Sequence, residues 1–311
     1  MNDSPKSDGR RPPALKTAIA FAIVYVVWGS TYLAIRFAIE TIPPLLMAGT
    51  RFLVAGAALY GWVLARGEAV RPTRGQWAAA ALLGGLFFLG GNGGVTWAEQ
   101  RVPSGLTSLI IATVPLWLVL LEWRRTQGAR PNILTSFGLL IGFSGVALLL
   151  SARGGPVGTE IDPIGGIVLL GATWSWASGT IYAKHLPRPP SLLQSGAMQM
   201  LAGGVLLCAA GAVAGEIPRL QAAELSARSL WSLVYLTVAG SAIAFTAYAW
   251  LIQTATPARV GTYAYVNPIV AVWLGWAFGG EAIGPRTLLA GFIVIAGVAL
   301  IITARGRQAG S

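Results

Sequence analysis

Few side chains in this sequence can hold or move a charge, and three of them lie inside or at the edge of long apolar stretches. Only 11% of the 311 residues are charged, whereas 55% are hydrophobic. Arg51 lies within one apolar stretch, and Glu99 and Glu281 each close another. A charge at the centre of a bilayer costs about 2.5–3.5 kcal/mol or more, so such residues are functional candidates. We take Arg51, Glu99 and Glu281 as the candidates for charge chemistry.

Each of these charges also has a simpler interpretation. Arg51 could meet a carboxylate of a bound molecule or pair with Glu99, but a role in helix packing or at the membrane interface is favoured. For Glu281 and Glu122 we favour a solvated or interface-paired carboxylate over a proton carrier. His185, the single histidine, is predicted to be a loop residue.

The remaining polar candidates are uncharged and aromatic, which favours a small molecule held by ring faces and hydroxyl groups. Asn92 lies in a run of four glycines, which leaves room for a bound molecule or a neighbouring helix. Pro268 removes a backbone donor and frees the carbonyl of Ala264, and Pro115 does the same for Ile111. Helix packing is the favoured alternative for each candidate. The binding candidates are Trp28, Asn92, Thr96, Ser108, Trp176, Tyr248, Tyr265 and Asn267.

The sequence contains few residues in patterns typical of an enzyme active site. Gly142-Phe143-Ser144-Gly145 resembles the nucleophile of an intramembrane serine protease, but no histidine is placed to act as its base. Cys208 is the single cysteine, which excludes an internal disulfide and a thiolate metal cluster. No phosphate-binding loop of the G-x-x-x-x-G-K-[ST] type is present, which argues against ATP-driven transport within this chain. No cofactor, metal ion or enzymatic activity is expected.

The elements that must position these residues are membrane-spanning helices. Apolar runs of about twenty residues recur along the chain, and each could cross a hydrocarbon core of about 30 Å. We therefore predict an all-α membrane protein, embedded in the lipid bilayer, with ten spans. They cover residues 16–35, 45–65, 75–97, 104–123, 132–151, 163–184, 192–213, 229–252, 257–279 and 285–304.

An internal repeat organises these spans. A shift of 153 positions places Trp97 on Trp250 and Pro115 on Pro268, and the Gly-Val-Ala-Leu at 145–148 recurs at 297–300. We expect a first repeat over 16–153 and a second over 163–305. Five spans per repeat is an odd number, so the second repeat must be inverted. Inverted repeats are typical of secondary transporters.

The basic residues predict the orientation. With the N-terminal tail (1–15) inside the cell, most of the 22 lysines and arginines fall on the cytoplasmic side. Both termini are therefore expected in the cytoplasm, with the chain in the inner (plasma) membrane. The net charge of +11 is explained by this bias, and no nucleic-acid partner is expected.

The sequence resembles the EamA-type, ten-helix branch of the drug/metabolite transporter superfamily over about residues 16–305. The resemblance rests on Trp28-Gly29-Ser30-Thr31-Tyr32, Arg51-Phe52, the aligned prolines Pro115 and Pro268, and Gly279-Gly280-Glu281. After the fourth span the family often has a second Gly-Glu pair, but here that region contains Glu122 several residues early.

The resemblance implies export or exchange of small metabolites by alternating access. Neutral or zwitterionic metabolites are favoured, amino acids first and aromatic ones among them, and efflux of amphipathic drugs is the alternative. A sugar phosphate is disfavoured because Arg51 stands nearly alone. A channel or a membrane-embedded enzyme is a remote alternative. Proton coupling and the oligomeric state are left open, and a monomer is compatible with the sequence.

Overall fold

The computed structural model describes residues 14–124, 131–151, 161–220 and 224–308, and these residues form helices and their connections without a strand. Most of the expected N-terminal tail lies outside the described residues. The spans, in chain order, are α1 (Ala14–Ala38); α2 (Pro44–Ala65); α3, η1 and α4 (Arg74–Gly84, Gly85–Gly93 and Gly94–Ala98); α5 and α6 (Ser104–Ile111 and Val114–Trp123); α7 (Ile133–Leu150); α8 (Pro163–Ala183); α9 (Leu192–Val213); α10, η4 and α11 (Ala227–Tyr235, Leu236–Ile243 and Ala244–Thr254); α12 and α13 (Pro257–Val260 and Tyr263–Gly279); and α14 (Pro285–Gln308).

Nine helical segments of the described chain are long and apolar enough to cross a membrane. The tenth, α13, has 17 residues and follows the short α12 after a two-residue break. The prediction of ten membrane-spanning helices in two inverted five-helix repeats is confirmed.

Polar and proline residues set where the helices begin. Thr73 caps α3 in a capping box with Gln76, and Asn132 and Asp162 accept hydrogen bonds from the first turns of α7 and α8. Pro163 occupies the first turn of α8, where its missing N–H costs nothing. The chain thus marks its helix starts by local chemistry, while apolar composition supplies the length between them.

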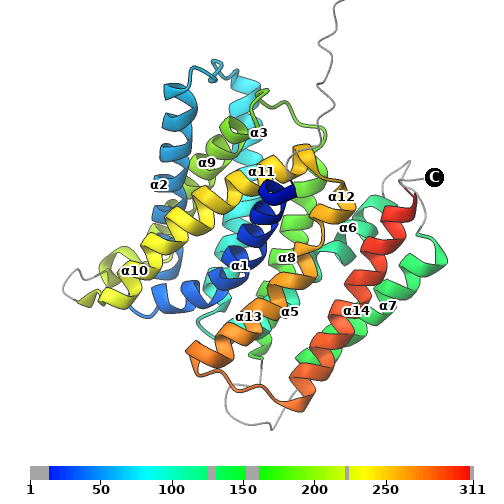
Figure 1. Ribbon diagram of the computed structural model, residues 1–311. Helices are drawn as coiled ribbons and strands as arrows, with labels where there is room; N and C mark the ends of the chain where they lie inside the picture. The colour runs from blue at the N-terminus through cyan, green and yellow to red at the C-terminus, as the bar shows by residue number, and fades with distance from the viewer. Residues whose placement is uncertain (1–13, 125–130, 152–160, 221–223, 309–311) are drawn as a thin grey trace, which may run out of the picture.

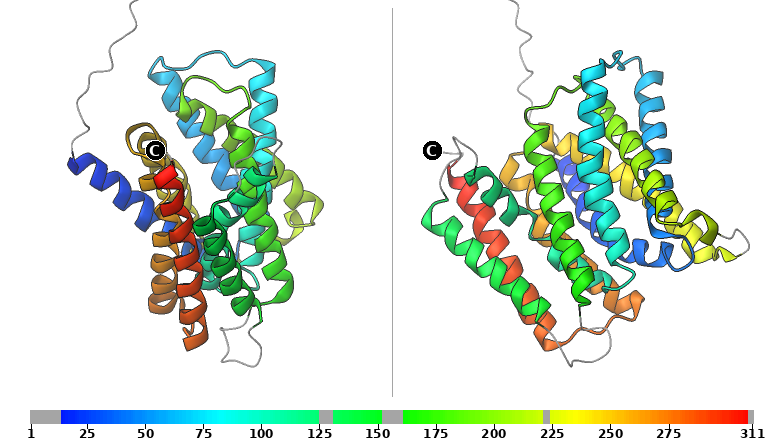
Figure 2. Two further views of the ribbon diagram at one scale, coloured as in Figure 1. Left: turned by 90° about the vertical axis from the view of Figure 1, so that its right-hand side faces the viewer. Right: turned by 180° about the vertical axis from the view of Figure 1, so that it is seen from behind.

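The two halves pack on each other in a reciprocal pattern. The first helix of the chain, α1, packs against α13 and against the η4 helix with its flanking segments. Its counterpart in the second half, α8, packs against α6 and against η1 with its flanking segments. The counterparts α2 and α9 lie side by side, as do α7 and α14, and form opposite edges of the bundle in Figures 1 and 2.

The third helix of each half contains a π-helix at the same relative place. η1 covers Gly85–Gly93 and η4 covers Leu236–Ile243. π-Helical turns are rare and often occur at functional sites. Each of these segments faces the first helix of the other half, so the irregular backbone lies at the interface between the repeats.

The bundle has two ends, which are named here by their carboxylates. In Figure 1 the start of α1 and the end of α14 lie toward the upper end, which is called the Glu122 end. The connection from α13 to α14 lies at the lower end, which is called the Glu281 end. The site residues are distributed between these two ends and the interface of the halves.

Candidate functional site

A group of aromatic rings joins α1 to the second half. Trp28 lies 4.9 Å from Tyr248 and 5.4 Å from Tyr263, measured between ring centroids. Its indole nitrogen donates a hydrogen bond to the carbonyl of Gly240 in η4, at 3.1 Å. The structure thus brings the predicted residues Trp28 and Tyr248 together and gives Trp28 a partner in a π-helix. We call these three rings the Trp28 cluster.

Asn267 lies beside this cluster and is buried. With its side-chain amide nitrogen facing α1, it donates to the carbonyls of Tyr25 (3.2 Å) and Tyr263 (3.3 Å). The glycine at position 29 allows this close approach, since a Cβ there would lie 3.1 Å from the Asn267 carbonyl oxygen. The Tyr25 hydroxyl also hydrogen-bonds Thr262. Tyr25 was missed from the sequence, although its position three residues before Trp28 on one helix face was a usable signal.

Trp176 occupies the corresponding place in the other half. Its ring lies 5.1 Å from that of Phe87 and rests on Gly91, where a Cβ would lie 2.9 Å from the indole. The neighbouring Ser175 donates to the carbonyl of Leu86 in η1, at 2.8 Å. The glycines around Asn92 therefore make room for helix α8. Of the two roles expected for them, space for a bound molecule or for a neighbouring helix, the structure shows the second.

The other uncharged candidates bond within their own helices. The Asn92 side chain donates to the Phe87 carbonyl (3.2 Å), Thr96 donates to the Asn92 carbonyl (2.8 Å), and Ser108 donates to the Gly105 carbonyl (2.6 Å). Tyr265 is partly buried against the main core. These four residues do not join the Trp28 cluster, so the eight predicted residues form separate groups along the interface.

Arg51 is buried and does not pair with Glu99. Its Nε donates to the Ser241 hydroxyl at 2.7 Å, and its guanidinium lies 4.7 Å from the centre of the Phe52 ring. The alternative in which Arg51 pairs with Glu99 is therefore not what the structure shows. The short Ser241 side chain in η4 stands closer and orients the guanidinium, so Arg51 ties α2 to η4 and the packing interpretation is favoured.

Glu281 closes one end of the bundle. Its Oε1 accepts from the backbone N–H and hydroxyl of Ser104, both at 2.7 Å, and its Oε2 accepts from the N–H of Gly105 at 2.9 Å. Arg36 at the end of α1 adds an ion pair at 3.3 Å. The carboxylate thus caps α5, where the helix dipole and free N–H groups favour a negative charge.

The glycines before Glu281 explain its position. Gly280 adopts the left-handed conformation (φ 64°) and ends α13, which returns Glu281 against Gly275. A Cβ at Gly275 would lie 2.5 Å from Glu281 Oε2. The Gly-Gly-Glu motif is thus a helix stop that delivers a carboxylate to α5. Of the two forms expected for Glu281, solvated or interface-paired, the structure shows the paired one.

The opposite end carries a related ion pair. Lys184, just after α8, donates to Glu122 near the end of α6 at 2.9 Å. Arg36 lies in the last turn of α1, and Lys184 directly follows the equivalent helix α8. Each pairs with the fourth helix of the other repeat: Arg36 with Glu281 after α13, and Lys184 with Glu122 in α6. Glu122 is more exposed than Glu281, with 32% of its side chain accessible against 6%.

Glu99 differs from every other described carboxylate near the interface. It follows α4 directly, is 4% exposed, and neither of its oxygens has a hydrogen-bond partner. Burial raises the pKa of its carboxyl well above the usual range. The charge of Glu281 raises this pKa further, while Arg36 and Arg51 lower it.

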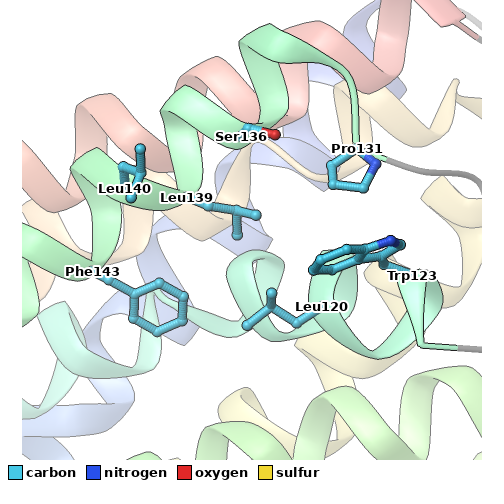
Figure 3. Close-up of a pocket in the computed structure, with 7 residues that line it drawn as sticks. All are labelled: Leu120, Trp123, Pro131, Ser136, Leu139, Leu140 and Phe143. Atoms are coloured by element: carbon cyan, nitrogen blue, oxygen red, sulfur yellow. The ribbon is translucent and has the colours of Figure 1, made fainter.

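The described residues hold no group of three histidine, cysteine, aspartate or glutamate side chains that could bind a metal ion. A hollow of about 540 Å³ lies between α6 and α7 near the Glu122 end, lined almost wholly by apolar side chains (Figure 3). Its lining includes the exposed residues Trp123 and Leu140, so it opens on the outer, apolar face of the bundle. It is not part of the interface between the halves.

The inverted repeats, the reciprocal interface and the ion pairs at both ends define a class: a multi-pass helical membrane transporter. A family model described as the EamA-like transporter family matches residues 15–151 and again residues 163–303. The chain belongs to this family of the drug/metabolite transporter superfamily.

Relatives extend this assignment over nearly the full chain. The uncharacterized inner membrane transporter YedA of Escherichia coli strain K12 is 41% identical over 283 residues, which cover 91% of this chain and 89% of YedA. The uncharacterized transporter YvbV of Bacillus subtilis is 28% identical, covering 91% and 90%. A protein of known crystal structure has the same fold, with a TM-score of 0.62 at 21% identity and coverage of 93% and 98%. The chain is therefore a multi-pass inner membrane transporter.

Proposed function

We propose that this protein is a secondary transporter that exports or exchanges small neutral or zwitterionic metabolites by alternating access. Amino acids are the first candidates, with aromatic ones among them. The observation that supports this proposal most strongly is the reciprocal packing of α1 and α8 on the π-helices of opposite halves. Such an interface offers two equivalent arrangements, in which either half can rock against the other while the binding site stays between them.

The chemistry of the interface supports an uncharged or zwitterionic substrate. Trp28 and Tyr248 offer ring faces, and Asn267 offers an amide beside them. The two cations near this interface, Arg51 and Arg36, already bond Ser241 and Glu281. Recognition of a phosphate favours free arginine or lysine clusters, so sugar phosphates fit less well.

The orientation belongs to the proposal. The loop between α2 and α3 carries Arg66 and Arg71, and Arg74 begins α3. This loop lies toward the Glu122 end, as does the start of α1. By the positive-inside rule this end faces the cytoplasm. The Glu281 end then faces outward.

Uptake of a labelled amino-acid panel into proteoliposomes tests the function. We expect a rate that saturates with concentration and that shows counterflow when the same compound is loaded inside. A flux that never saturates would indicate a channel and contradict the proposal. Amphipathic dyes, run beside the panel, test the alternative of multidrug efflux, which the aromatic rings of the Trp28 cluster favour.

A further inference from the structure

The Glu99 carboxyl is placed where an ionised form is not stabilised. Both oxygens are buried without a hydrogen-bond partner. Removing an unpaired carboxylate from water costs several kcal/mol, and such groups take up a proton instead. A neutral Glu99 carboxyl therefore fits this conformation better than an ionised one.

The charged groups around Glu99 already bond other residues, and none of them donates a hydrogen bond to it. From α1, Arg36 is bound to Glu281, and Tyr32 lies close enough for the charge of Glu99 to act on its hydroxyl. From α2, Arg51 is bound to Ser241. The segment after α13 adds the negative charge of Glu281, which itself uses the free N–H groups of α5.

The remaining helices that pack against α4 add no competing charge. The π-helix η1 has no titratable side chain in its sequence. Helix α8 carries Asp162 at its start, and this carboxylate caps α8 through the N–H of Gly165 at 2.7 Å. Arg101, in the loop after Glu99, lies over the ring of Trp97 at 5.1 Å. Glu99 and Glu281 therefore both lie near Arg36, and only Glu281 contacts it.

We propose that Glu99 is a proton-binding site that keeps the Glu281 end closed while it is neutral and releases this end when it ionises. An ionised Glu99 would repel Glu281 and compete with it for Arg36. The step moves one proton from the carboxyl to water at the Glu281 end, and the reverse step closes that end. Because Glu281 holds the end of α13 to the start of α5, weakening this contact separates helices of the two halves.

The consequence for transport rests on the proposed function, but the site itself can be tested without a transported compound. The first test is infrared spectroscopy of the purified protein across a range of pH. We expect the carbonyl band of a neutral carboxylic acid at neutral pH that is absent in Glu99→Gln and retained in Glu40→Gln. Glu40 is a matched control because it is exposed and pairs with Arg228 at 3.5 Å. A band that survives in Glu99→Gln, or no such band in the unmodified protein, would overturn the proposal.

The second test follows the opening of the Glu281 end. In a Cys208→Ala background, Thr107→Cys places a thiol on α5, one turn beyond Ser104, at a site that is fully buried. We expect labelling by a maleimide, corrected for the thiolate fraction, to rise about tenfold from mildly acidic to mildly alkaline pH, a typical coupling between sites. In Glu99→Gln the corrected rate should stay low and flat. Equal profiles with and without Glu99 would refute the proton site.

Glutamine has the shape of a neutral carboxylic acid, so Glu99→Gln is expected to fold. If the amino-acid panel shows no transport while both tests succeed, the proposed function fails and the proton site stands. If transport is found, but Glu99→Gln changes neither the infrared band nor the labelling rate, the proposed function stands and the proton site fails.

Discussion

At the scale of single residues, three glutamate carboxyls near the interface differ in their burial and in their partners. Glu281 is satisfied by the start of α5 and by Arg36, Glu122 is half exposed and paired with Lys184, and Glu99 is buried alone. The sequence marked these positions as candidates because charges are rare at membrane depth. It could not predict their partners, since each partner comes from another helix.

Glu99 gives a prediction for the dependence of stability on pH. Its folded-state pKa is raised, so the folded protein binds more protons than the unfolded chain above the usual carboxyl pKa. The free energy of unfolding should therefore fall as pH rises through this window, by up to about 1.4 kcal/mol per pH unit. Thermal unfolding of the detergent-purified protein measures this effect. The slope of unfolding free energy against pH should be smaller in Glu99→Gln and unchanged in Glu40→Gln. Equal slopes in these two variants and the unmodified protein would contradict the prediction.

Arg51 is predicted to act in folding more than in binding. Arg51→Ala leaves the Ser241 hydroxyl without its donor and opens a gap beside Phe52. A hydrogen bond to a charged group contributes about 1.5–3 kcal/mol, so folded yield should drop in size-exclusion chromatography while KM changes little. Arg228→Ala, at an exposed position, is the control. Full yield with a raised KM would favour direct contact with substrate.

The binding candidates are tested by two truncations. Trp176→Ala and Asn267→Ala should lower the transport rate while membrane expression stays near that of the unmodified protein, because each removes a contact between the halves. Uptake assays normalised to the amount of reconstituted protein measure this. Unchanged transport in both variants would remove these residues from the site.

At the scale of elements, helix positions were predictable and helix irregularities were not. Each expected span coincides with a helix within a few residues, because hydropathy sets the length and proline, glycine and capping residues set the ends. The π-helices η1 and η4 have no clear sequence signature. They lie where Trp176 and Trp28 contact the opposite half. The shift of 153 residues predicted the repeat but not which faces of its helices meet.

The packing of α7 on α14 provides a test at this scale. A Cβ at Gly297 would lie 2.5 Å from the backbone nitrogen of Gly142 and 2.7 Å from the carbonyl oxygen of Gly138. Gly297→Ala should therefore lower stability by about 1–3 kcal/mol through overpacking. Gly171 is the matched control, because a Cβ there meets nothing within 4 Å. Thermal unfolding should show a lower Tm for Gly297→Ala alone; equal Tm values would mean that the two helices can separate without cost.

At the scale of the whole molecule, the two halves form one interface with an ion pair at each end. Arg36 with Glu281 closes one end, and Lys184 with Glu122 lies at the other. The equivalent positions of Arg36 and Lys184, at the ends of α1 and α8, follow from the inverted repeat. If the protein works by the proposed alternating access, one end must open before the substrate can leave, and locking either end should stop transport.

Reversible locking of the Glu122 end tests this central claim most directly. In the Cys208→Ala background, Glu122→Cys and Lys184→Cys are combined and joined by a short, reducible thiol crosslinker, and counterflow is measured in proteoliposomes. Each single-cysteine variant treated with the same reagent is the control. Alternating access predicts that counterflow is lost on crosslinking and returns on reduction, whereas counterflow that continues at full rate with this end locked would contradict it.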